Sequence, residues 1–302
     1  MAHVSYRRGV QRYTSSDEDS ARWETFPFRS GDIVVSTRSK SGTTWVQMIC
    51  ALLVHGPDLP APLGELSPWL DHAVAPLDRV VGRLEGQPYR RIIKTHTPLD
   101  GVPIDPRATY LVVGRHPLDL AVSLYHQGDN IDRERVAELT GVPVRRATRP
   151  VLHEWLVEWT RDETTPQERM DSLVGVVHHA ADAWSRAEST DNVTLLHYAD
   201  LRADLDGEMR RVADLLGVTV AEDRWPALVA AAGFDRMRDR AETVVPNAGG
   251  VLKDPARFFR SGGTGEGAAT LSDDELAAYQ ARVATMARPK VVAWLHEGTA
   301  RG

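Results

Sequence analysis

The sequence is poor in cysteine, lacks long apolar runs and has no excess of positive charge. It has one cysteine in 302 residues, Cys50, so no disulfide can form within the chain. No apolar run approaches the ~18 residues of a transmembrane helix, and the amino terminus lacks the apolar core of a secretion signal. The net charge of −6 argues against non-specific binding to nucleic acid. These absences predict a protein without a membrane-spanning segment, in a reducing, cytoplasmic compartment.

The chain also lacks an internal repeat and a proline-, serine- or glycine-rich linker. With 42% hydrophobic and 26% charged residues it has the composition of a globular protein. We therefore expect one domain over residues 1–302. Residues 1–22 are polar and charged and predict a loosely ordered arm, so Trp23 is the first residue expected to anchor to a core.

Residues 32–53 predict a strand, a polar loop and a helix. The β-branched run at 33–35 favours a strand, and apolar residues at 45, 48, 49, 52 and 53 share one helical face. A loop that leads into a helix offers free backbone N–H groups to an anion, and Lys40 adds a full charge. The glycine that precedes the lysine in a Walker A loop is missing. The stretch thus predicts an anion-binding loop of another kind, although a plain strand–helix turn fits the spacing as well.

Three more short strands are predicted at 91–98, 110–114 and 193–198, and helices alternate with them. This alternation predicts a three-layer α/β/α fold with a central parallel sheet. Ligands bind such sheets beyond the carboxyl ends of the strands. The four predicted strands end in the polar groups of Lys40 and Ser41, Lys94 and His96, Arg115, and Tyr198.

Taken singly, these residues allow ordinary interpretations. Arg115 and Ser123 could clamp a phosphate, but a surface ion pair and a solvated serine fit equally well. His96 could act as a base beside Lys94, but it is one of 11 histidines. The pair His178–His179 has no further ligand at metal spacing and is interpreted as structural. No acidic cluster suggests a metal site.

Four segments, in the same order along the chain, resemble segments of the cytosolic-type sulfotransferase family. The resemblance suggests a bacterial member of that family. They are Lys40-Ser41-Gly42-Thr43-Thr44-Trp45, Lys94-Thr95-His96-Thr97-Pro98, Arg115-His116-Pro117 through Ser123, and Tyr198-Ala199-Asp200-Leu201. The resemblance covers roughly residues 30–270. It implies the α/β/α fold and transfer of a sulfuryl group from 3′-phosphoadenosine 5′-phosphosulfate (PAPS) to an acceptor hydroxyl or amine, without a metal, leaving 3′-phosphoadenosine 5′-phosphate (PAP).

The resemblance also implies a site. His96 would be the base, and Lys40 and Lys94 would stabilise the charge that develops during transfer. Arg115, Ser123 and Arg260 would hold the 3′-phosphate, and Trp45 and Phe234 would sandwich the adenine. The implied nucleotide contacts are Arg38, Ser39, Lys40, Ser41, Gly42, Thr43, Thr44, Trp45, Arg115, Ser123, Tyr198, Phe234, Arg260, Ser261 and Gly262.

The sequence departs from the family at three places. Thr37-Arg38-Ser39 replaces the usual Thr-Tyr-Pro, the stretch 260–267 lacks the family's tryptophan and second lysine, and the dimer-forming segment is only faintly echoed in 270–275. The oligomeric state is therefore left open. A P-loop-type kinase or NTPase and a non-catalytic nucleotide-binding module are the alternatives. The acceptor, a small molecule, lipid or glycan, should be set by 60–90, 127–150 and 241–256.

Overall fold

A parallel sheet forms the centre of the fold. The structure, a computed structural model, describes residues 10–141, 143–144, 148–245, 247 and 249–299. The strands are β1 (Ile33–Thr37), β2 (Ile92–Thr95), β3 (Thr109–Gly114) and β4 (Val193–His197). They are parallel and lie in the order β2-β1-β3-β4, with Val35 opposite Lys94 and Gly114 opposite His197. This confirms the predicted parallel sheet.

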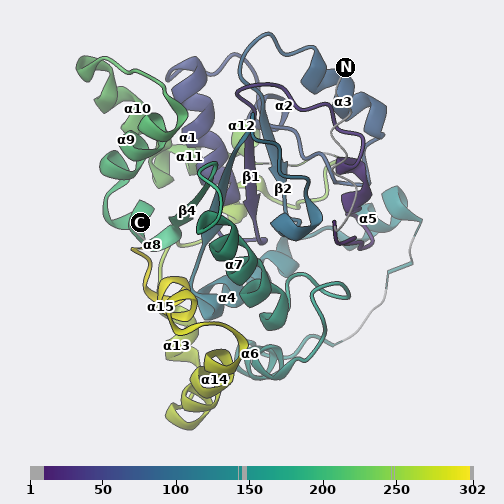
Figure 1. The fold of residues 1–302 in the computed structure, drawn as a ribbon. Coiled ribbons are helices and arrows are strands. Elements are labelled where there is room, and N and C mark those ends of the chain that lie inside the picture. The colour runs from purple at the N-terminus through teal and green to yellow at the C-terminus, as the bar shows by residue number, and fades with distance from the viewer. Residues whose placement is uncertain (1–9, 142, 145–147, 246, 248, 300–302) are drawn as a thin grey trace.

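Helices surround the sheet in the described part of the chain (Figure 1). In chain order they are α1 (Thr43–His55), α2 (Leu63–Leu66), α3 (Leu77–Glu85), α4 (Pro117–Asn130), α5 (Arg133–Thr140), α6 (Leu152–Arg161), α7 (Leu173–Ala187), α8 (Tyr198–Ala203), α9 (Leu205–Leu216), α10 (Trp225–Ala232), α11 (Phe234–Asp239), α12 (Ala241–Val244), α13 (Glu266–Thr270), α14 (Asp273–Met286) and α15 (Pro289–Glu297). Short 3₁₀ turns lie at Ser20–Trp23, Leu99–Gly101, Glu222–Arg224 and Pro255–Phe258.

The two faces of the sheet enter different cores because side chains alternate along a strand. Val35 and Leu111 point to the face covered by α1, α9 and α10. Val34 and Val112 point to the opposite face, where they meet α3, α7 and the segment around Trp23. A third core joins α4, α6, α7, α14 and α15 below the sheet in Figure 1. The fold is thus the predicted α/β/α arrangement.

Local sequence signals set several helix ends. α4 starts at Pro117, where a missing N–H has no cost. α9 ends at Leu216, and Gly217 closes it in a left-handed conformation with φ of 63°. These boundaries depend on the residues next to them and not on tertiary contacts.

The prediction of a loosely packed arm is wrong for residues 10–22. The Tyr13 side chain is fully buried, and its hydroxyl contacts Asp100 and His178 at 2.9 Å. Glu18 and Ser20 are buried as well. The composition misled because this segment is held by long-range polar contacts instead of an apolar face. Residues 1–9, the rest of the predicted arm, lie outside the described residues.

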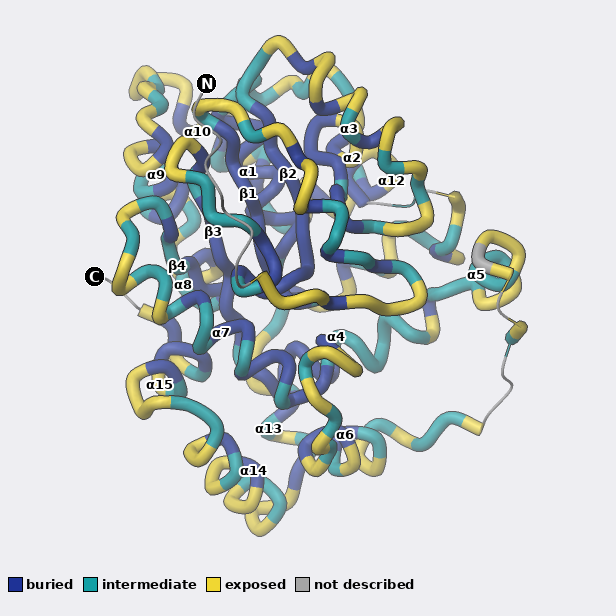
Figure 2. The backbone as a smooth tube through the Cα atoms, turned by 45° about the vertical axis from the view of Figure 1, so that its right-hand side comes forward, coloured by how far each residue is buried: buried dark blue, intermediate teal, exposed yellow. Residues whose placement is uncertain are grey.

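Exposure follows this layout. In Figure 2 the strands and α1 are buried, and exposed backbone lies at the periphery, including α5 and α14. Within the described ranges no helix combines the length and the apolar character that crossing a bilayer requires. The cytoplasmic location inferred from the composition stays a prediction, as does the single domain.

Candidate functional site

The loop after β1 has the backbone of an anion cradle. Lys40 takes a left-handed conformation with φ of 65°, and Gly42, the residue that precedes α1, has φ of 104°. A side chain at Gly42 would also meet the Tyr198 ring at 3.1 Å. Thr43 and Thr44 open α1, so their N–H groups belong to its positive end. The loop therefore aims backbone donors and the Lys40 side chain at one place.

An open cleft with about 600 Å³ of free space lies beside this loop, between α1, α4, α8 and the 258–262 segment. It is lined by Lys40, Gly42, Thr43, Thr44, Trp45, Arg115, Ser123, Tyr198, Phe234, Met237, Phe258, Phe259, Arg260, Ser261 and Gly262. The structure thus brings together most of the predicted nucleotide contacts. Met237, Phe258 and Phe259 also line the cleft and were not predicted.

Lys40 lies in this cleft without a carboxylate partner among the described residues. Its Nζ is 3.6 Å from the centre of the Phe258 ring and 3.4 Å from Gln127 Oε1. Burial, and then the positive charges of Arg115 and Lys94, lower the pKa of Lys40 to about 7. An anion in the cleft would restore the charged form.

Arg115 forms the second cationic position of the cleft. Its Nη1 donates to Lys40 O at 2.7 Å and its Nη2 to Gly263 O at 3.3 Å, whereas the buried Nε has no described partner. Its guanidinium lies 4.3 Å from the centre of the Tyr198 ring. Burial lowers the pKa of Arg115. A buried guanidinium with a donor to spare fits a phosphate.

Aromatic rings line the rest of the cleft. Trp45 is held by its Nε1 donating to Ala232 O at 2.9 Å, and it meets Tyr198 edge-on at 5.4 Å. Phe234 packs edge-on against Phe259 at 5.7 Å. Gly262, with φ of 60°, has no room for a Cβ, which would lie 2.9 Å from Phe234. The predicted adenine contacts Trp45 and Phe234 therefore line one cleft.

Arg260, the third predicted phosphate contact, has a carboxylate partner in this structure. Its guanidinium pairs with Glu266 at the start of α13. Ser123 lines the cleft from α4. A ligand phosphate would compete with Glu266 for Arg260.

His96 is buried and holds its proton on Nδ1. That nitrogen is 2.7 Å from Thr37 O, and a carbonyl oxygen can only accept, so Nδ1 must donate. The other ring nitrogen, Nε2, is left with its lone pair. Burial, and then the charges of Lys94 and Arg38, lower the pKa of His96 well below its ordinary value. The residue therefore has the neutral tautomer that a general base requires.

Lys94 and His96 meet at the indole of Trp69. Lys94 Nζ lies 3.8 Å from the centre of the Trp69 ring, and the His96 ring meets it edge-on at 4.8 Å. Burial lowers the pKa of Lys94 to about 8, against the opposing charges of Glu18 and Asp71. The sequence predicts that Lys94 and His96 lie side by side, and in the structure Trp69 contacts both.

Arg38, Ser39 and Ser41 do not line the cleft, and their assignment as nucleotide contacts stays a prediction. Arg38 donates to His96 O and, from Nη2, to Asp171 Oδ1 at 2.7 Å. The backbone N–H of Ser39 reaches the same carboxylate at 3.3 Å. Asp171, from the connection between α6 and α7, was missed because nothing local in the sequence marks it.

The predicted structural histidines take part in packing contacts. His178 contacts Tyr13 and Asp100, and His179 Nε2 lies 3.1 Å from Ser36 Oγ. Across the residues that the structure describes, no group of three or more His, Cys, Asp or Glu side chains could hold a metal ion.

Comparisons with known proteins agree on one family. The sulfotransferase domain model matches residues 30–287. A glycolipid sulfotransferase of Mycobacterium tuberculosis is 39% identical over 307 residues, covering 95% of this chain and 94% of that protein. Sulfotransferase 1A1 of Bos taurus is 24% identical over 278 residues, covering 89% and 88%.

Solved structures agree on the fold. Retinol dehydratase in complex with androsterone and the inactive cofactor PAP has a TM-score of 0.65 at 19% identity and covers 88% of this chain and 83% of that one. Mouse sulfotransferase SULT7A1, complexed with PAP, has a TM-score of 0.64 at 17% identity and covers 91% and 90%. Together with the domain match and the mycobacterial relative, the site places this chain in the sulfotransferase family, as an enzyme of that class.

Proposed function

We propose that the enzyme transfers a sulfuryl group from PAPS to a hydroxyl of a glycolipid. The proposal is carried by two observations: a cleft lined by Lys40, Arg115 and Arg260, and His96, which follows the neighbouring strand β2 outside the cleft lining and whose Nε2 is free to accept a proton. The donor follows from the match to the family and from the PAP complexes of its structural neighbours. The acceptor class follows from the 39% identical glycolipid sulfotransferase.

The cleft fits the donor in three respects. Lys40 and the N–H groups at the start of α1 suit a phosphosulfate. Arg115 offers an unused buried donor near Ser123, which suits the 3′-phosphate. Trp45 and Phe234 offer ring surfaces to a base.

His96 takes the proton of the acceptor hydroxyl onto Nε2 as the oxygen–sulfur bond forms. The sulfur–oxygen bond to the 5′-phosphate breaks in line, and PAP leaves with the bonding electron pair. Lys40 and Lys94 stabilise the charge on the sulfuryl and phosphate oxygens. The protein contributes position and electrostatics, as in phosphoryl transfer.

Two measurements test this proposal. Purified enzyme is incubated with ³⁵S-labelled PAPS and a panel of glycolipids, phenols and amines, and the sulfated product is identified. In parallel, PAP and ATP with Mg²⁺ are compared as stabilisers of the folded protein, since a ligand at 100 times its Kd adds about 2.7 kcal/mol.

Transfer of label together with stabilisation by PAP supports the proposal. Stabilisation by ATP with Mg²⁺ and transfer of its γ-phosphate would instead favour the kinase alternative. Binding of PAP without transfer to any acceptor class would favour the non-catalytic module.

A further inference from the structure

Glu18 is a buried carboxylate that the proposed mechanism does not use. Its residue is 7% exposed, and among the described residues its side chain takes part in no hydrogen bond or ion pair. Burial raises the pKa of Glu18 to about 8. A carboxyl group that is mostly buried and has no partner among the described residues can accept a hydrogen bond from a ligand.

The amino-terminal segment places Glu18 opposite His72. Asp19 N donates to Asp71 O at 2.9 Å and Ala73 N to Asp17 O, which makes Glu18 the antiparallel partner of His72. Opposed residues of an antiparallel pair share one face, so Glu18 and His72 project together.

That face leads directly to the catalytic groups. The His72 ring stacks on Trp69 at 4.3 Å, and Trp69 in turn contacts Lys94 and His96. Among the neighbouring charged groups, Glu18 has the largest effect on the pKa of Lys94. Glu18 therefore belongs to the shell around Lys94, on the side of Trp69.

Among the neighbouring charges, that of Arg38 has the largest effect on the pKa of Glu18, but the Arg38 guanidinium already has hydrogen-bond partners. Its two terminal nitrogens serve His96 O and Asp171. Three buried polar atoms of neighbouring residues, Trp69 Nε1, Asp71 Oδ1 and Arg38 Nε, have no described partner. An aromatic side chain beside a carboxyl group suits a molecule that carries hydroxyl groups on an apolar ring face.

We propose that Glu18 is an acceptor-binding residue that takes a hydrogen bond from a hydroxyl neighbouring the one that His96 deprotonates. The acceptor class is then a sugar ring or another vicinal polyol, rather than a phenol or an alcohol with one hydroxyl. This inference rests on the proposed function and deepens it.

The test compares Glu18→Gln and Glu18→Ala with wild type on two chain-matched acceptors, octyl β-glucoside and 1-octanol. Exposed Glu24→Gln, from the same segment, is the control. Because a pKa of about 8 leaves Glu18 mostly protonated at pH 7, we expect Glu18→Ala to lower kcat/KM for the glucoside by about 3- to 10-fold, the usual worth of a hydrogen bond between neutral groups. Transfer to octanol and the Kd of PAP should stay within about twofold.

Monodeoxy octyl glucosides sharpen the result and remain informative if Glu18→Ala does not fold. The deoxy sugar that lacks the bonded hydroxyl should be equally poor with wild type and Glu18→Gln, because the two changes remove one interaction. Equal losses on glucoside and octanol, or additive losses across all the deoxy sugars, would overturn the role of Glu18. A higher kcat/KM of the wild-type enzyme for 1-octanol than for octyl β-glucoside would also overturn the role of Glu18. The proposed function fails only if labelled sulfate reaches no acceptor at all.

Discussion

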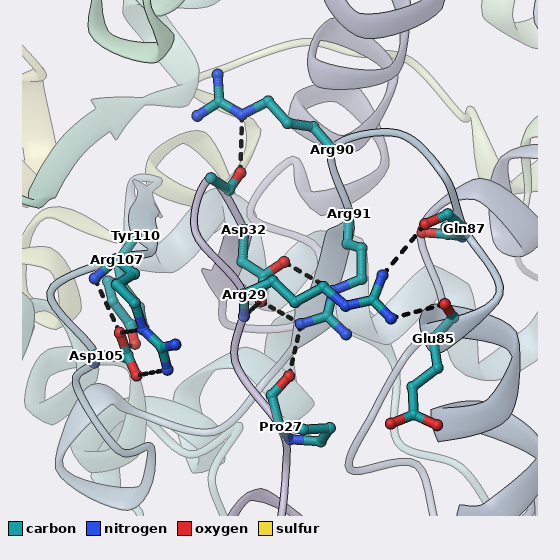
Figure 3. Close-up of polar contacts among 11 residues, drawn as sticks. Pro27, Arg29, Asp32, Glu85, Gln87, Arg90, Arg91, Asp105, Arg107 and Tyr110 are labelled. Carbon is teal, nitrogen blue, oxygen red and sulfur yellow. Dashed lines mark hydrogen bonds and ion pairs between the residues drawn. The ribbon is translucent and has the colours of Figure 1, made fainter. Parts of the chain in front are cut away.

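The two ends of the sheet differ in how their cations are paired. At the carboxyl end, Lys94 and Arg115 are buried and Lys40 is half-buried, and none of the three forms an ion pair within the described residues, although Arg38 beside them pairs with Asp171. At the amino end, buried charge is matched by charge of the other sign. Figure 3 shows this second region, where Arg91 meets Asp32 in front of the strands.

The pair Arg91–Asp32 is almost completely buried, at 1% exposure for each side chain. Arg91 Nε donates to Asp32 Oδ1 at 2.7 Å, and Nη2 reaches both Asp32 and Pro27 O. Arg29 donates nearby to Gln87 O and Glu85 O (Figure 3). This end joins the segment before β1 to the start of β2, which is a structural task.

The contrast explains why both ends can hold buried arginines without doing the same work. A paired buried charge is stabilised within the folded chain itself. An unpaired buried cation lowers the stability of the free protein. An anionic ligand that pairs with it removes this cost, and the free energy recovered contributes to ligand binding. Variants at the two ends should therefore separate activity from stability.

His96→Ala should give the largest loss of activity at the carboxyl end. We expect kcat to fall by about 10²- to 10⁴-fold, the usual contribution of a general base, with a small change in Tm. A labelled-sulfate assay and a thermal melt measure both. Exposed His153→Ala is the control, and unchanged kcat in His96→Ala would remove the assignment of the base.

Arg91→Met should do the reverse at the amino end. Removing one partner of a buried pair leaves Asp32 uncompensated, so we expect a loss of about 3–5 kcal/mol in the free energy of unfolding. The Kd of PAP for the folded protein should not change. Denaturant unfolding measures the loss.

Arg107→Met is the matched control for that change. Arg107 pairs with Asp105 across 2.7 Å at the same end, but its side chain is 55% exposed. We expect less than about 1 kcal/mol from an exposed pair. Equal losses from Arg91→Met and Arg107→Met would show that burial does not set the value of these pairs.

Arg115→Lys tests which phosphate the second cation holds. A lysine keeps the charge but loses the planar fork, so we expect the Kd of PAP to rise by about 10- to 100-fold. Adenosine 5′-phosphate lacks the 3′-phosphate, and its Kd should change little. Calorimetric titration with both ligands gives the comparison. If both ligands weaken equally, Arg115 does not discriminate the 3′-phosphate.

How far the sequence predicts the molecule differs between these regions. The strand ends and the loop at 40–45 carry local signals, so Lys40, His96 and Arg115 could be found from pattern and resemblance. Arg38 and Asp171 are 133 positions apart, and Glu18 and Lys94 meet through a bridge to His72. Such pairs form only when distant segments of the chain pack together. They therefore leave no periodic pattern in the sequence from which they could be predicted.

The last prediction concerns proton uptake by Lys40. Its pKa is about 7 in the free protein, and an anion beside it must raise that value. Below pH 7 the side chain is already charged, so the Kd of PAP should be flat. Above pH 7 binding must take up a proton, and the Kd should rise towards tenfold per pH unit. Calorimetry in buffers of different ionisation enthalpy counts the proton directly.

The same pKa gives the free protein a stability slope of opposite sign. An unfolded lysine titrates near 10.4, so between pH 7 and that value the unfolded chain binds more protons at this residue than the folded one. The contribution of Lys40 to stability therefore rises with pH over the window in which PAP affinity falls. Lys40→Arg stays charged throughout and should flatten the affinity profile while leaving the paired amino end untouched. An affinity profile that keeps its slope in Lys40→Arg would assign the proton to another group, with Lys94, whose pKa is about 8, the next to replace.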